Sequence, residues 1–191
     1  MSLKPLSINQ WDESLAPILS DMNGRPINVH KLMAHHPALL QAWWNFRNYS
    51  VAGGDLGQRR CELVILRVAV HMKAWYEWGS HVERSLRCDI TLTEIERVRL
   101  GGDAPGWNDA EALLLKAVDE LIADYGLSKE SRQALEQYFT TQQLMDLMAI
   151  HGMYVILACM INTWGLELDD HVQKQLPDSI SRERFKAEVT P

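Results

Sequence analysis

The spacing of apolar residues constrains the fold of this chain more than any other feature. Leu63, Leu66 and Val70 recur three or four positions apart, and the same period returns between Asn108 and Ala123. That spacing places side chains on one face of a helix, whereas a strand requires alternation. No run of alternating apolar and polar residues bounded by hairpin turns occurs in the sequence. We therefore predict an all-α domain of roughly eight helices.

Breaker and capping residues divide the chain into these helices. Pro37 suits the first turn of a helix, and Gly53 with Gly54 interrupts the chain. Thr91 and Glu94 form a capping-box signature. Helices are expected at residues 14–22, 28–50 with a new start at Pro37, 57–70, 74–87, 93–100, 109–123, 128–138 and 142–163.

The composition is that of one ordinary globular domain with extensions. The chain has 191 residues, of which 47% are hydrophobic and 23% are charged. We place a helical domain at residues 28–170, an N-terminal arm at 1–27, and a C-terminal tail at 171–191 that is loosely held beyond Pro177. The net charge is −6 and no Lys/Arg run occurs. Nucleic-acid and membrane partners are therefore not expected.

The most apolar segment, Leu144 to Ile161, contains Asp146 and His151. We interpret this segment as too short and too polar to cross a bilayer, and hence as a buried helix. No apolar h-region follows Lys4, so the sequence has no recognisable signal peptide. These features favour a cytoplasmic location.

The three cysteines, Cys61, Cys88 and Cys159, form no CxxC motif and cannot all pair within one chain. Free thiols in a reducing compartment are the simplest interpretation. Cys159 lies in an apolar run and is expected in the core. Cys61, next to Glu62, is a weaker candidate for a functional thiol.

Three titratable side chains, Glu62, Glu77 and His81, occur in an apolar and aromatic setting. Burial and mutual charge can shift their pKa values toward neutrality, so such a set can move a proton. Glu77 and His81 are four positions apart, and Glu77 could therefore orient the imidazole from the same helix face.

Glu62 is too far along the sequence to join them on one straight helix. It would lie roughly 28 Å from His81 at about 1.5 Å per residue. A turn within residues 70–73, or a second subunit, is needed to bring the two together. The simpler alternative is a surface pair at Glu77 and His81, with Glu62 as a capping or surface carboxylate.

The spacing of these residues resembles the carboxymuconolactone decarboxylase / alkylhydroperoxidase D (AhpD-like) family, whose redox members carry Glu-x11-Cys-x2-Cys-x3-His. Counting from Glu62, the two cysteine positions fall on Ala74 and Glu77, and the histidine falls on His81. Further similarity lies in residues 32–37, 43, 62–69, 76–78 and 152–166. The resemblance is to a branch of the family without the CxxC pair.

The resemblance implies an AhpD-like all-α fold that assembles as a dimer, trimer or hexamer, with sites near subunit contacts. The redox branch is a dithiol peroxidase, and neither Ala74 nor Glu77 can supply a thiolate for that route. The decarboxylase branch removes CO2 from a carboxylated lactone. That reaction needs a proton donor and an acceptor, and no metal or organic cofactor.

Our hypothesis is a cofactor-free acid/base enzyme resembling the decarboxylase branch, acting on a small carboxylated substrate such as a product of aromatic degradation. His81 would be the proton shuttle, Glu77 its orienting partner and Glu62 a tuning carboxylate. Arg67 and Arg84 are candidates for holding the substrate carboxylate. The seven histidines lack the spacing of a metal site, so no metal is predicted.

Two alternatives stay open. The chain could be a binding or structural protein that keeps the family fold and a relict site. A redox enzyme would instead require Cys61 or Cys88 to act alone.

Overall fold

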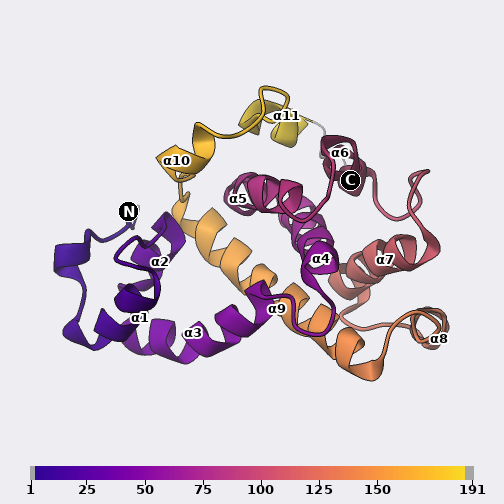
Figure 1. The fold of residues 1–191 in the computed structure, drawn as a ribbon, viewed down its shortest axis with the longest axis horizontal. Coiled ribbons are helices and arrows are strands. Elements are labelled where there is room, and N and C mark those ends of the chain that lie inside the picture. The colour runs from indigo at the N-terminus through magenta and orange to yellow at the C-terminus, as the bar shows by residue number, and fades with distance from the viewer. Residues whose placement is uncertain (1–2, 188–191) are drawn as a thin grey trace.

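Helices and short turns make up the described part of the chain, residues 3–187 of a computed structural model (Figure 1). No strand occurs in that range, so the predicted all-α fold is confirmed. Residues 1–2 and 188–191, which belong to the predicted arm and tail, lie outside the described residues. After two 3₁₀ turns at Ile8–Gln10 and Glu13–Leu15, the helices are α1 (Ala16–Asp21), α2 (Asn28–Met33), α3 (Pro37–Val51), α4 (Gln58–His71), α5 (Trp75–Leu86), α6 (Leu92–Leu100), α7 (Asp109–Asp124), α8 (Lys129–Leu135), α9 (Thr141–Trp164), α10 (Asp170–Gln173) and α11 (Arg182–Ala187).

Local signals set most of the helix starts. Pro37 occupies the first position of α3, where its missing N–H costs no hydrogen bond. Thr91 and Glu94 form the predicted capping box of α6, and the Asn108 side chain accepts from the Glu111 amide at the start of α7. These helices therefore begin where the sequence predicts.

Helix α4 lies at the centre of the fold, with α5, α6, α7 and α9 packed around it (Figure 1). Every residue from Cys61 to Val70 is buried. A helix surrounded on all sides has no solvent-facing polar stripe, which explains why this segment is almost entirely apolar. Glu62 and Arg67 are its charged exceptions, and each needs a partner inside the fold.

The chain turns back sharply between α4 and α5 without glycine or proline. Lys73 takes the left-handed conformation, with φ +53°. The amide of Ala74 donates to the Ala69 carbonyl at 2.9 Å, and the amide of Lys73 donates to the Val70 carbonyl at 3.1 Å, which is a Schellman ending. From α9, the Asn162 side chain donates to the Met72 carbonyl at 2.7 Å. This turn places α5 alongside α4.

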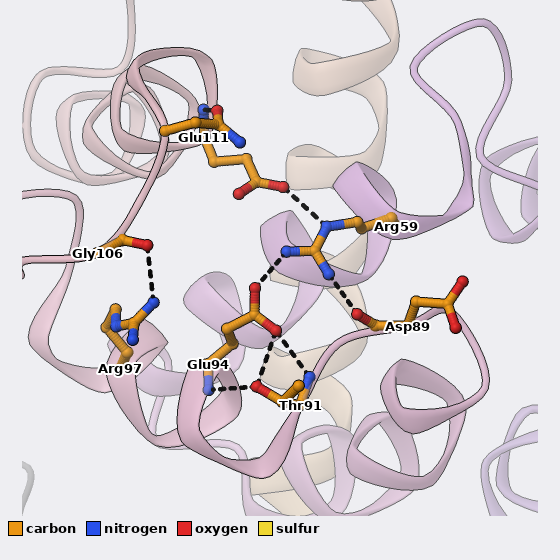
Figure 2. Close-up of polar contacts among 8 residues, drawn as sticks. Arg59, Asp89, Thr91, Glu94, Arg97, Gly106 and Glu111 are labelled. Atoms are coloured by element: carbon orange, nitrogen blue, oxygen red, sulfur yellow. Dashed lines mark hydrogen bonds and ion pairs between the residues drawn. The ribbon is translucent and has the colours of Figure 1, made fainter.

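Arg59 ties the start of α4 to two other helices (Figure 2). Its Nε donates to Glu111 Oε1 at 2.8 Å, its Nη1 to the Asp89 carbonyl at 2.6 Å, and its Nη2 to Glu94 Oε1 at 2.5 Å. Partial burial alone would raise the pKa of Glu94, but hydrogen bonds from Arg59 and Thr91 hold it at about 2. The charges of this cluster are therefore fully paired.

The C-terminal segment is more firmly packed than the loosely held tail predicted from the sequence. Phe185 in α11 is buried, and its ring centroid lies 5.4 Å from that of Trp78 and 5.8 Å from that of Trp75. Val172 and Ile180 are buried as well. Widely spaced single apolar residues among charges give no helical period, so the sequence did not reveal this packing.

Helix α9 differs from its prediction in two respects. It has 24 residues, and its most apolar 18-residue window has a mean hydropathy of 1.9, so by length and composition it could cross a membrane. Half of this apolar stretch is buried inside the domain, where α9 packs against α3 and α4, as in the core helix of a soluble protein. Cys159, predicted in the core, is exposed on its outer side.

Candidate active site

Glu62 and His81 meet inside the fold. Glu62 lies near the start of α4, and the turn at Lys73 returns the chain so that His81 in α5 stands opposite it. His81 Nδ1 is 2.6 Å from Glu62 Oε2, and both side chains are more than nine-tenths buried. The prediction that these residues lie on different helices within reach of one proton is confirmed. Their burial excludes the surface alternative.

Tyr154 from α9 completes this group. Its hydroxyl is 3.1 Å from His81 Nε2, and the two rings meet edge to face with centroids 5.1 Å apart. A carboxylate only accepts hydrogen bonds, so we assign the imidazole proton to Nδ1 facing Glu62. The Tyr154 hydroxyl, whose pKa is raised by burial, then donates to Nε2. Three helices thus fix the orientation and tautomer of one imidazole.

Opposing effects act on the His81 proton. Burial lowers the pKa of His81, the adjacent Glu62 carboxylate raises it, and the guanidinium groups of Arg84 and Arg47 lower it. The net effect is a lowered pKa, which favours the neutral imidazole near pH 7.

Glu77 is isolated from this chain of hydrogen bonds. It is 2% exposed, and neither carboxyl oxygen has a hydrogen-bond partner within the described residues. Burial raises the pKa of Glu77 well above its ordinary value of 4.5, which favours the neutral carboxylic acid over the carboxylate. The predicted role of Glu77 as orienting partner of His81 is wrong in this structure, because Glu62 makes that contact.

Glu77, His81 and Tyr154 line one small cavity. Its volume is about 40 Å³, room for roughly three water molecules at about 10–15 Å³ each. The wall is mostly apolar and aromatic, with polar groups at a few points. The lining residues are Ile27, Val29, His30, Trp43, Arg47, Val51, Tyr76, Glu77, Ser80, His81, Arg84, Met153, Tyr154, Leu157 and Ile161.

The two candidate arginines lie in different places, Arg67 outside this cavity and Arg84 on its wall. Arg67 donates to Asp119 at 2.5 Å and to two backbone carbonyls, so it holds helices together instead of facing a ligand. His71 shares Asp119 with it at 2.6 Å. Arg84, the other arginine predicted to hold a substrate carboxylate, does line the cavity.

The cysteines offer no activated thiol. Cys61 is buried, donates to the Ser50 carbonyl at 3.3 Å, and has its pKa raised by burial. Burial also raises the pKa of Cys88. A raised pKa disfavours the thiolate needed for redox chemistry. Among residues 3–187, no group of three or more His, Cys, Asp or Glu side chains has the arrangement of a metal site.

Sequence reasoning missed Tyr154, Arg47 and His30, which reach the cavity from α9, α3 and α2. For Tyr154 a signal was available, since a tyrosine within an apolar helix needs a partner for its hydroxyl group. For Arg47 and His30 no local pattern indicated a pocket, because their helices meet α5 only in the folded chain.

An all-helical fold with a buried Glu–His pair on two adjacent helices defines an AhpD-like protein. Residues 37–120 match the model of the Carboxymuconolactone decarboxylase family, and this match supports the predicted resemblance to that family. The matched segment ends before α9, the helix that supplies Tyr154. No curated protein gives a match.

Several solved structures share the fold. An alkylhydroperoxidase AhpD core protein, described as peroxidase-related, from Ralstonia eutropha JMP134 has a TM-score of 0.75 at 16% identity, covering 90% of this chain and 95% of its own. A peroxidase-related protein from Silicibacter sp. TM1040 has a TM-score of 0.76 at 15% identity, covering 92% and 96%. The debrominase Bmp8, in complex with 2,3,4-tribromopyrrole, has a TM-score of 0.75 at 14% identity, covering 98% and 97%. These similarities confirm the AhpD-like fold.

Proposed function

We propose that this protein is a cofactor-free acid/base enzyme resembling carboxymuconolactone decarboxylase, acting on a small carboxylated substrate. The observation that carries the proposal is Glu77, a buried, unpartnered carboxyl group that lines a cavity beside an oriented imidazole and whose pKa burial raises. Perturbed pKa values of this kind are typical of functional sites. An unpaired buried carboxyl group is costly, and a structural role would have provided it with a partner.

Glu77 would act as the proton donor. When the substrate carboxylate leaves as CO2, the electron pair of the broken C–C bond passes into the conjugated remainder of the substrate. The Glu77 proton then adds to the carbon that carries the charge. Glu77 is left ionised in an apolar cavity, which favours rapid recovery of a proton from water. The net change is one CO2 lost and one proton gained by the substrate.

His81 would serve as the neutral base and hydrogen-bonding group of the site. Glu62 and Tyr154 hold the ring on the cavity wall, with the basic Nε2 accepting from the Tyr154 hydroxyl, so Tyr154 would have to release Nε2 before it takes up a proton. The Glu62 carboxylate would stabilise the imidazolium form if His81 takes up a proton during turnover. The two carboxyl groups thus have different roles because one is paired and the other is not.

The small cavity favours a second candidate, a binding or structural protein with a relict site. A substrate with more than a few heavy atoms must displace side chains or extend past the half-buried Arg47 and Arg84. The bound tribromopyrrole of Bmp8 supports a small cyclic ligand for a fold of this kind. Under this alternative, ligands would bind without being converted.

A screen of carboxylated lactones and related acids for CO2 release distinguishes the candidates. Wild-type turnover should fall about 10²–10⁴-fold in Glu77→Gln and in His81→Asn. Glu83→Gln is the matched control, because Glu83 lies on the same helix and pairs with Arg87. Turnover by Glu77→Gln at the rate of Glu83→Gln would remove Glu77 from the mechanism. Binding without conversion by the wild type would support the relict site.

We further propose that the protein assembles with copies of itself. Large apolar residues are exposed on α3 and α9, which pack against each other: Leu39, Phe46, Tyr49, Met145, Met148 and Ile156. Exposed apolar surface of this kind is typical of subunit contacts. Sedimentation at micromolar concentration should reveal an oligomer that Met148→Lys weakens, and a monomeric wild type would contradict the proposal.

A further inference from the structure

Two arginines face the cavity without a carboxylate partner. Arg47 comes from α3, and Arg84 comes from α5, three residues after His81. Both are half-buried, whereas His81, Glu77 and Tyr154 are buried, so the arginines form the outer part of the wall. We propose that Arg47 and Arg84 together bind the carboxylate group of a small organic anion and position it against His81.

The lack of countercharge is the first argument. Within residues 3–187, Arg47 contacts only the Asn48 side chain amide oxygen at 2.9 Å and the face of Trp44, whose ring centroid lies 5.2 Å from Cζ. Arg84 forms no ion pair there. By contrast, Arg59 and Arg67 each meet carboxylates. Two cations on one cavity wall repel each other, and an anion between them would relieve that repulsion.

The electrostatic coupling of the two arginines agrees with this placement. Burial lowers the pKa of Arg47, and the charge of Arg84 lowers it further. The same two groups lower the pKa values of His30 and His81. The arginines are thus close enough to each other and to both histidines for one bound anion to act on all four groups.

A second, independent observation points to a polar ligand in the same cavity. His30 is 3% exposed and lines the wall, and its Nδ1 has no hydrogen-bond partner within the described chain. The indole Nε1 of Trp43, on the same wall, has none either. Burial lowers the pKa of His30 to about 3, so its ring is neutral near pH 7. These groups can hydrogen-bond a ligand whose carboxylate lies on the arginines.

The chemistry favours a planar carboxylate. Guanidinium groups bind carboxylates through paired, charge-assisted hydrogen bonds, and aromatic side chains of the wall can pack against an attached ring that displaces side chains or extends past the arginines. A single negative charge between the two cations also halves the positive charge that Arg47 and Arg84 place on the cavity wall. The inference deepens the proposed function and rests on it for the identity of the reacting group, but binding itself can be tested without turnover.

Benzoate and benzamide form a suitable probe pair, because they share a ring and differ in charge. Titration calorimetry should detect benzoate but not benzamide. In Arg47→Gln and in Arg84→Gln, benzoate binding should weaken by about 10-fold or more, as expected for the loss of a charged hydrogen bond. Arg87→Gln is the matched control, since Arg87 is exposed on the same helix and pairs with Glu83. Arg84→Lys, which keeps the charge, should recover part of the affinity.

The His81 titration provides a readout that a structural role would not affect. His81 is faced by Glu62 from α4, Tyr154 from α9, Glu77 and Arg84 from α5, and Arg47 from α3. Benzoate should raise the His81 pKa, because it offsets the two arginines. Arg84→Gln should raise the pKa without ligand, because it removes one of them.

Three outcomes would overturn the inference. These are equal binding of benzoate and benzamide, an unchanged benzoate affinity in both arginine variants, and binding of inorganic phosphate but not of benzoate. The Glu77→Gln variant separates this inference from the proposed function. If Glu77→Gln and wild type bind benzoate equally through the arginines but no acid is ever decarboxylated, the anion site stands and the proposed reaction fails.

Discussion

Charged side chains are paired at the start of α4, whereas some of those around the cavity beside α5 have no partner within residues 3–187. At the start of α4, three donors of Arg59 meet acceptors on Glu94, Glu111 and the Asp89 backbone (Figure 2). Around the cavity, Glu77 is unpartnered and Arg84 forms no ion pair within the described chain. The same sequence can therefore satisfy its charges fully where they hold helices together. Polar groups without partners, inside a protein whose other buried charges are paired, mark the place where a ligand would supply the missing hydrogen bonds.

The largest effect is expected from the pH dependence of folding in Glu77→Gln. Above the ordinary carboxyl pKa of 4.5, the unfolded chain releases the Glu77 proton while the folded chain keeps it. Folding stability therefore falls as the pH rises, by about 1.4 kcal/mol per pH unit while the folded form stays protonated. The Glu77→Gln variant has no ionisable group at this position, so its stability does not fall with pH for this reason. Urea unfolding measured upward from pH 5 should show the stability of the variant rising relative to that of the wild type, and parallel curves would contradict a raised Glu77 pKa.

A pair of arginine substitutions sharpens the comparison between paired and unpaired charges. Arg67→Gln should lower the free energy of unfolding by about 3 kcal/mol, because it removes the charged partner of Asp119 and the donor to two backbone carbonyls, one of them buried. Arg84→Gln should change it by no more than about 0.5 kcal/mol, because no protein partner is lost. Urea unfolding measures both values. Equal losses in the two variants would mean that Arg84 has a structural partner after all.

The smallest effect tests the Glu62–His81 hydrogen bond inside the site. The Glu62 carboxylate raises the pKa of His81 against the effect of burial, so Glu62→Gln should lower that pKa further. An NMR titration of the histidine ring signals follows this change directly. Glu83→Gln, on the outer part of α5, should leave the His81 titration unchanged. If Glu62→Gln does not lower the His81 pKa, the result would contradict the contact between Glu62 and His81.

The fold could be predicted well where signals are local. Pro37, the Thr91–Glu94 box and Asn108 mark helix starts through their own backbone chemistry, and these starts were found. The turn at Lys73 could not be found from the residues alone, because a left-handed lysine carries no sequence signal and the turn is held partly by Asn162 from α9. The family spacing supplied what the local sequence lacked.

The site was predictable in its residues but not in its pairings. Glu62, Glu77 and His81 were named from spacing, and all three are buried near one another. The i,i+4 rule indicates Glu77 as the partner of His81, but Glu62 makes the contact. The choice between the two carboxylates depends on how the side chains of α4 and α5 pack together. Arg47 reaches the cavity from a distant helix, and no periodicity within that helix reports such a contact.

The position of Tyr154 in the chain has a consequence for biosynthesis. It follows His81 by 73 residues, which a ribosome adding about 5–20 residues per second needs roughly 4–15 s to supply. During that interval α9 does not exist, one wall of the cavity is missing, and water reaches Glu77. The burial that raises the Glu77 pKa is then absent, so we expect Glu77 to be ionised until α9 packs in place. Completion of α9 would thus couple proton uptake at Glu77 to the last stage of folding.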